Sequence, residues 1–193
     1  MLVLLAGLVI FLGVHSVSIA APGWRAAQVA RRGEGAWKGV YSIASALGLA
    51  LIVVGYGLAR REPVLIYTPP SGLAHLALLL MLPVFPLLLA AYLPGRIRAA
   101  VKHPMLLAVK LWAAAHLLAN GTLADLLLFG GFLGWAVLDL ISVKRRSAAE
   151  AHRAPAAPAG RANDAIAVVG GLAIYGLFVA GGHRWLTGVS PLA

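Results

Sequence analysis

Cysteine is absent from this chain of 193 residues, and acidic side chains are scarce, with six Asp and Glu in all. Without thiols the chain has no disulfides and no thiolate ligands for a metal. Charged residues make up 11% of the sequence, against roughly 25% in an average soluble domain. Hydrophobic residues make up 61%, more than a soluble fold of this length can hide from water. The composition therefore predicts an integral membrane protein.

Six apolar runs are candidates to cross the bilayer, for which a helix needs about 20 residues. Lipid cannot satisfy the backbone of open strands, so each run is predicted to be a helix. The first run lacks the basic start of a secretory signal and is expected to be retained. The predicted fold is an all-α, polytopic membrane helix bundle with six transmembrane helices in a single domain over residues 1–193. The expected spans are 2–21, 40–59, 73–93, 104–120, 122–143 and 164–186.

The distribution of Lys and Arg predicts the orientation of these spans. Twelve basic residues fall in the segments 22–39, 94–103 and 144–163, and three fall in segments on the opposite side. Cytoplasmic loops carry such an excess, so we expect both termini on the non-cytoplasmic side of a bacterial inner membrane. The basic residues lie between apolar runs as orientation signals do, so the formal net charge of +10 does not indicate nucleic-acid binding. An Ala- and Pro-rich stretch, 147–163, is predicted to be a flexible cytoplasmic linker that carries His152 in solvent.

Two histidines are expected deep inside predicted spans, where an ionisable group costs roughly 2.5–3.5 kcal/mol. His15 is expected about 9–10 Å, and His116 about 18–20 Å, from the cytoplasmic ends of their helices. Neutral imidazoles at such compatible depths are suitable ligands for a haem iron. We therefore predict that His15 and His116 are the metal ligands of a bound haem b. The alternative is that each forms a structural interhelical hydrogen bond, worth roughly 0.6 kcal/mol.

Lys110 is a charge within the fourth predicted span and needs a compensating partner. It is expected to pair with Asp139, to extend toward the headgroups, or to contact a haem propionate. Trp112 lies one helical turn before His116 and shares its helix face. Its ring is therefore expected either to pack on a flat cofactor or to pack against a neighbouring helix.

The other histidines are expected near the ends of spans. His103 precedes Pro104, a residue well placed to start a helix, and is expected at the cytoplasmic mouth of the fourth span. His75 and His183 are expected at the outer interface.

Proline and glycine predict local irregularities. Pro83 and Pro86 are expected to kink the third span, which can open a pocket beside it. A hinge at Asn120-Gly121 is expected to join the fourth and fifth spans in a tight hairpin. Close helix approach is expected at Gly130, Gly131, Gly134, Gly170, Gly171 and Gly176.

Several motifs together resemble the NnrU-type bacterial membrane proteins over roughly residues 8–140. They are Phe11 to Ser16, Tyr41 to Ser45, Gly55-Tyr56, Lys102-His103-Pro104 and Trp112 to Gly121. The resemblance implies a role in denitrification, in the expression or activity of nitrite and nitric oxide reductases. The chain is also similar to zeta-carotene isomerase, a haem b membrane enzyme that converts a cis double bond of a linear carotenoid to trans.

The resemblance to the isomerase implies specific site residues. Its haem-ligating histidines correspond to His15 and His116, and His103 corresponds to the histidine of its Arg-His-Pro segment. The isomerase carries a cysteine three residues before its second ligand, where this chain has Ala113. A sulfur ligand is therefore not available at that position.

Three functions remain open at this stage. The first is a haem b protein that supports nitrite and nitric oxide reduction by electron transfer, sensing or maturation, with a respiratory membrane complex as partner. The second is a haem-dependent cis-trans isomerase of a carotenoid or another polyene or isoprenoid lipid. The third is a cofactor-free membrane scaffold. The sequence singles out no catalytic residue, and its cofactor-binding candidates are His15, His116, Lys110, Trp112 and His103.

Overall fold

The computed structural model describes residues 1–150, 160 and 162–192, and their packing divides into two compact units. Unit 1 comprises Met1–Tyr67 and Gly121–Ser142, and unit 2 comprises Thr68–Asn120 together with the described residues from Val143 onward. Each unit is considered by itself. The prediction of one membrane domain concerns the arrangement of both units and stays a prediction, and most of the proposed 147–163 linker lies outside the described residues.

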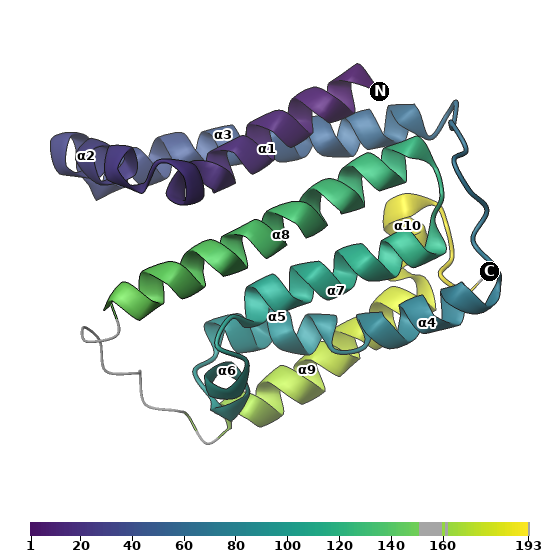
Figure 1. Cartoon of the computed structure of the whole chain (residues 1–193). Coiled ribbons are helices and arrows are strands. Elements are labelled where there is room, and N and C mark those ends of the chain that lie inside the picture. Colours follow the sequence, from purple (N-terminus) through teal and green to yellow (C-terminus); the bar gives the residue numbers. More distant parts are fainter. Residues whose placement is uncertain (151–159, 161, 193) are drawn as a thin grey trace. The chain divides into compact units, whose positions relative to one another are not determined.

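Unit 1 is built on two long antiparallel helices. Helix α1 (Leu2–Ala20) and helix α3 (Glu34–Ala59) lie side by side, joined by the shorter α2 (Pro22–Arg32), as Figure 1 shows. Residues 123–142 of α8 (Leu123–Glu150) complete the unit. Aromatic contacts tie α8 to both partners, because Phe132 packs on Phe11 of α1 and Phe129 packs on Tyr56 of α3.

Glycines bring α1 and α3 into backbone contact. A side chain added at Gly55 would collide with the backbone of Leu4. A Cβ atom at Gly48 would lie 2.8 Å from the Phe11 backbone nitrogen, and one at Gly7 would lie 2.6 Å from that of Ile52. Such small-residue faces are the usual basis of tight helix association in lipid.

The glycines singled out from the sequence behave differently from one another. A Cβ atom at Gly171 would meet the backbone of Pro86, so close approach there is confirmed. A Cβ at Gly131 or Gly170 would meet only side-chain atoms of a neighbour. At Gly130, Gly134 and Gly176 a Cβ would meet nothing within 4 Å among the described residues, so the structure shows no close approach there.

A buried carboxylate organises the start of α8. Asp125 is 4% exposed and accepts hydrogen bonds from the Tyr56 hydroxyl at 2.6 Å and from the Thr122 backbone and hydroxyl at 2.9 and 2.6 Å. Thr122 in turn accepts from the Asp125 N–H at 3.3 Å, which gives the reciprocal pattern of a capping box. Backbone bonds from Ile66 and Tyr67 to Gly121 hold the preceding segment in place. This network joins α3 to α8 within unit 1.

Unit 2 contains the remaining helices, packed around α5 and α7. The predicted third span is interrupted at Leu82 and Pro83, so the expected kink is confirmed. A small core forms where Val84 and Leu87 meet Ala108. The helices are α4 (Gly72–Met81), α5 (Val84–Tyr92), α6 (Arg96–Val101), α7 (Pro104–Ala119), α9 (Asn163–Leu177), the π-helical turn η1 (Phe178–Gly182) and α10 (His183–Thr187).

The start of α9 is anchored to the first residues of α6 and to the loop before them. Asp164 accepts hydrogen bonds from the backbone N–H groups of Arg96 and Ile97 at 2.9 and 3.0 Å. Asn163 donates from its side chain to the Pro94 carbonyl at 2.7 Å. The carboxylate thereby satisfies two N–H groups that begin α6 and have no partner within that helix.

Five helical segments in the described part of the chain are long and apolar enough to cross a membrane. They correspond to the first, second, third, fifth and sixth predicted spans. The predicted fourth span is α7, whose 16 residues rise about 24 Å against a hydrocarbon core of about 30 Å. The all-helical membrane class is confirmed, whereas the sixth crossing, the tight hairpin after it and the sides of the termini stay predictions.

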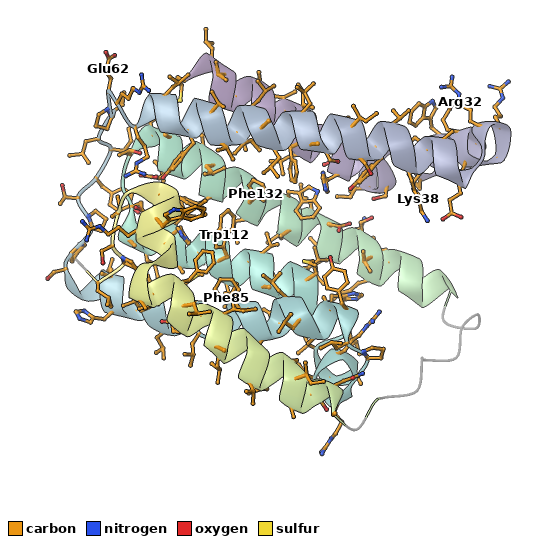
Figure 2. The ribbon with its side chains drawn as sticks, turned by 180° about the vertical axis from the view of Figure 1, so that it is seen from behind. Arg32, Lys38, Glu62, Phe85, Trp112 and Phe132 are labelled. Carbon is orange, nitrogen blue, oxygen red and sulfur yellow. The ribbon has the colours of Figure 1, made fainter. Side chains whose placement is uncertain are left out.

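The basic segment 22–39 is helical rather than a loop. It forms α2 and the first turns of α3, joined by Gly33 at a φ of 82°. Trp24 packs edge-on against Trp37 at 5.8 Å between ring centroids. Arg32 and Lys38 project outward at this end of the unit (Figure 2). The spacing of its Arg residues gives α2 a basic face, as expected of a helix at a membrane surface.

Candidate functional site

His116 is positioned by its own helix. Its Nδ1 lies 2.8 Å from the Trp112 carbonyl oxygen, one turn earlier in α7. A carbonyl only accepts hydrogen bonds, so Nδ1 carries a proton, and in the neutral ring Nε2 carries the lone pair. The same arrangement occurs in metal-bound histidines, where a hydrogen bond from the other ring nitrogen fixes the tautomer and the orientation of the ring. Asn120 caps the same turn by donating to the His116 carbonyl at 2.8 Å.

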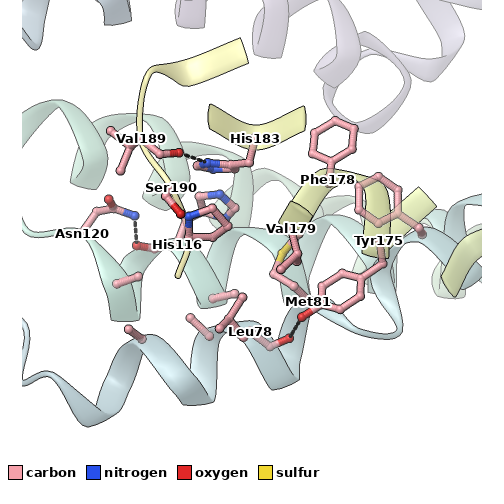
Figure 3. Close-up of a pocket in the computed structure, with 16 residues that line it drawn as sticks. Leu78, Met81, His116, Asn120, Tyr175, Phe178, Val179, His183, Val189 and Ser190 are labelled. Atoms are coloured by element: carbon pink, nitrogen blue, oxygen red, sulfur yellow. Dashed lines mark hydrogen bonds between the residues drawn. The ribbon is translucent and has the colours of Figure 1, made fainter. Parts of the chain in front are cut away.

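A cavity of about 200 Å³ lies beside His116, entirely within unit 2 (Figure 3). Leu78 and Met81 of α4 and Phe85 of α5 line it on either side of the proline interruption. Tyr175 of α9 also lines it and donates to the Leu78 carbonyl at 3.0 Å. A pocket beside the kinked span was expected from the prolines, and the structure confirms it.

His183 faces the same cavity. Its ring centroid lies 6.4 Å from that of His116, with 32° between the ring planes. Its Nδ1 lies 2.7 Å from the Val189 carbonyl oxygen, so its Nε2 also carries the lone pair. The chain reaches this carbonyl by turning at Gly188, whose φ of 78° is left-handed. His183, expected at the outer interface, thus also lines the cavity, and its depth in the bilayer stays a prediction.

The π-helical turn explains why sequence reasoning missed His183. An α-helix turns about 100° per residue, so eight residues would set His183 about 80° away from Tyr175. The extra residue in η1 rotates the following turn back toward the cavity, which Phe178 and Val179 also line. Hydropathy carries no signal of this insertion. The only sequence clue is Gly181-Gly182, which weakens the regular helix immediately before His183.

His15 lies in unit 1 among aromatic rings. Its Nδ1 is 2.7 Å from the Phe11 carbonyl oxygen, so the tautomer is the same as for His116. The imidazole stacks on Phe11 at 4.2 Å and contacts Tyr41 at 5.2 Å and Trp135 at 5.8 Å between centroids. The buried Nε1 of Trp135 has no hydrogen-bond partner among the described residues. Tyr41 of α3 belongs to this cluster.

The other predicted site residues are placed apart from the cavity. Trp112 contacts the His116 ring at 5.3 Å between centroids and also packs on the core of α5 and α7. Lys110 is half-buried on α7 and does not line the cavity. Helix α7 begins at Pro104, as predicted, and His103 immediately precedes it. His103 therefore lies about 20 Å along the helix axis from His116. His75 is exposed.

Two predicted pairings join the two units and stay predictions. His15 belongs to unit 1 and His116 to unit 2. Asp139 likewise belongs to unit 1, whereas Lys110 belongs to unit 2.

The atoms in these sites that could coordinate a metal are imidazole nitrogens. No group of three or more His, Cys, Asp or Glu side chains is placed to hold a metal ion within the described residues. Each histidine in these sites nevertheless presents an Nε2 lone pair whose direction a backbone bond fixes. Such imidazoles bind transition metals or haem iron and also accept hydrogen bonds from hydroxyl groups.

Comparison with known proteins supports a single family. A family model described as "NnrU protein" matches residues 3–191. No curated protein and no solved structure matches the chain.

Proposed function

Because this chain belongs to the NnrU family, we propose that it is a haem b-binding membrane protein that supports denitrification. The observation that carries the proposal is the tautomer of His116, whose Nδ1–H bond to Trp112 aims an Nε2 lone pair away from the helix backbone. His15 has the same backbone bond and would be the second histidine to hold the group. Haem, when bound, supplies the redox-active iron.

The residues around both histidines fit such a group. Aromatic rings beside His15 and His116 offer flat apolar surfaces. The Trp135 N–H beside His15 has no hydrogen-bond partner in the described part of the chain, and it is a donor that a bound polar group would satisfy. The cavity beside His116 is smaller than the roughly 300–1,000 Å³ of a typical ligand site, so most of the macrocycle would lie outside it.

Haem content tests the proposal. We expect the full-length protein, expressed with haem and purified, to show a Soret band that His116→Ala and His15→Ala each abolish. His75→Ala is the matched control, because His75 is exposed and lies outside the cavity. A wild-type protein that remains colourless after reconstitution would contradict the proposal. In a denitrifying host we expect loss of the gene to impair nitrite and nitric oxide reduction, and wild-type but not His116→Ala to restore it.

Lys110 distinguishes a structural from a cofactor role. If it contacts a haem propionate, Lys110→Met should lower haem retention while the folded yield is kept. If it forms an ion pair with Asp139, the same substitution should lower the folded yield in haem-free protein as well. Thermal stability and haem content measured on one preparation separate these outcomes.

The apolar cavity at the proline interruption favours a second candidate function, a haem-dependent cis-trans isomerase of a polyene lipid. Apolar side chains that line it, among them Leu78, Phe85 and Val179, suit part of a polyene. Incubating the reduced protein with a cis carotenoid and following its double-bond geometry tests this candidate. An unchanged cis double bond counts against the isomerase. A protein that folds and functions without haem would leave the membrane scaffold as the remaining candidate.

A further inference from the structure

We propose that helix α2 is an interfacial helix that docks on anionic phospholipid headgroups through its arginines. The helix belongs to unit 1 and lies at the end of the α1–α3 pair where Arg32 and Lys38 project outward (Figure 2). Neither of the histidines proposed to hold haem belongs to α2. The proposal is therefore independent of haem binding and goes beyond it.

The neighbouring helices place α2 at the level of the headgroups. Helix α1 has 19 residues and rises about 28 Å, close to the roughly 30 Å of the hydrocarbon core. Helix α3 has 26 residues and rises about 39 Å, so about 9 Å of it extends beyond that core. Gly55 packs on Leu4 and Gly48 on Phe11, an antiparallel register that brings the end of α1 beside Gly39. The excess length of α3 therefore lies at its first turns, next to α2.

Basic side chains dominate this end of unit 1. Residues 22–38 carry four basic residues and one acidic residue, so their net charge is +3. Lys38 pairs with the acidic residue, Glu34, at 2.9 Å, and the two side chains are 70% and 69% exposed. Arg31 and Arg32 are exposed in the last turn of α2. Their positive charge complements an anionic membrane surface.

The two sides of α2 match the two layers of a membrane interface. At about 100° per residue, its arginines fall within an arc of about 120° and its exposed alanines within a neighbouring arc of about 100°. The arginines are Arg25, Arg31 and Arg32, and the alanines are Ala26, Ala27 and Ala30. Alanine side chains bury little apolar area, so charge supplies most of the attraction. We therefore expect docking to depend on anionic lipid.

Two tryptophans favour lipid over an acidic protein segment as the partner. Trp24 is 54% exposed and contacts Trp37 edge-on at 5.8 Å between ring centroids. The Arg25 guanidinium lies 6.0 Å from the centroid of the Trp37 ring. Indole rings are enriched at the headgroup level of membranes. The aromatic and basic groups thus lie together at the depth where phosphates of the surrounding bilayer are found.

The absence of cysteine allows one spin label to report the depth of α2. We would label Ala27→Cys in the full-length protein, held in nanodiscs of phosphatidylcholine alone or of phosphatidylcholine and phosphatidylglycerol in equal parts. Oxygen concentrates in hydrocarbon and a nickel chelate stays in water, so the label's accessibility to each gives its depth. We expect the label to be immersed in the mixed lipid, exposed in phosphatidylcholine, and released from the mixed lipid by high salt.

Charge variants on the labelled protein test the role of the arginines. The double variant Arg31→Gln and Arg32→Gln should lower the ratio of immersed to exposed label about 25-fold, because each basic residue near an anionic surface contributes a factor of about five. Arg31→Lys with Arg32→Lys keeps the charge and should keep most of the immersion. The matched control, Arg60→Gln with Arg61→Gln, removes the same charge beyond the other end of α3 and should behave as the unmodified charge pattern does.

Elution profile and thermal stability in detergent show that each variant is folded. The proposal is overturned if the label has the same depth in both lipids, or if the Arg31→Gln and Arg32→Gln variant is immersed as fully as the protein with both arginines. Protection of the label by a soluble polyglutamate peptide, but not by phosphatidylglycerol, would assign this surface to an acidic protein partner and would also overturn the proposal.

Discussion

His15 and His116 share a tautomer but differ in their surroundings. In unit 1, His15 is enclosed by Phe11, Tyr41 and Trp135, on helices whose glycines let the backbones touch. In unit 2, His116 lies beside a cavity at an interrupted span. The same backbone bond thus holds one imidazole in a packed aromatic cluster and another at an open site. The comparison shows that aromatic rings pack around His15, whereas space remains beside His116.

The largest effect is expected from a substitution that forces α1 and α3 apart in unit 1. We expect Gly55→Val to lower the free energy of unfolding by about 3 kcal/mol or to prevent folding, because the new side chain collides with the Leu4 backbone. Gly57→Val is the matched control, since its Cβ would meet nothing within 4 Å. The measurement is the folded yield and thermal transition in detergent. Equal stability of the two variants would contradict a stabilising role for the backbone contact between α1 and α3.

Removing the buried carboxylate of unit 1 should have the next largest effect. Asp125→Ala deprives the Tyr56 hydroxyl and the Thr122 N–H of their acceptor, so we expect a loss of about 2–3 kcal/mol. Tyr56→Phe removes one donor and leaves the capping box, and it should cost about 1 kcal/mol. Chemical unfolding followed by tryptophan fluorescence gives both values. A milder effect for Asp125→Ala than for Tyr56→Phe would contradict this ranking.

The corresponding cap of unit 2 should matter less. Asp164 is half-buried and caps only the short helix α6, so we expect Asp164→Ala to cost about 1 kcal/mol. Asp164→Asn keeps an acceptor and should recover part of the loss. If Asp164→Ala destabilises the protein as strongly as Asp125→Ala, this ranking of the two caps is wrong.

The smallest expected effect is at the C-terminal turn. Gly188 has a left-handed φ of 78°, so Gly188→Ala should cost about 1 kcal/mol and loosen the Val189 carbonyl that orients His183. Nuclear magnetic resonance of the histidine ring nitrogens reports the change. The His183 signals should shift while those of His15 stay unchanged, and an unaltered His183 tautomer population would show that the turn does not orient it.

Five membrane-length helical segments were predictable from apolar length, and α7 begins at Pro104 as its proline predicted. The interruption of the third span followed from Pro83. The close contact of Gly48 and Gly55 with α1 was not predicted. Their spacing of seven residues places both on one face of α3, but the sequence does not say which face meets a partner helix. The helix α2 was missed because segment 22–39 was interpreted through its charge alone.

The candidate site was only partly predictable. Pattern and resemblance singled out His15, His116 and Trp112, since a polar ring in an apolar span is conspicuous. The cavity role of His183 was not predictable, because it depends on one residue inserted in η1 and on the chain returning at Val189. Local backbone geometry, unlike hydropathy, leaves no periodic trace in the sequence.

Low-temperature electron paramagnetic resonance of the oxidised, haem-reconstituted protein tests the central claim that His116 presents its Nε2 to a haem iron. The account predicts a low-spin signal typical of two imidazole ligands, converted to a high-spin signal or lost in His116→Ala. A low-spin signal that is the same in wild type and His116→Ala, or the absence of any haem signal from folded wild-type protein, would contradict it.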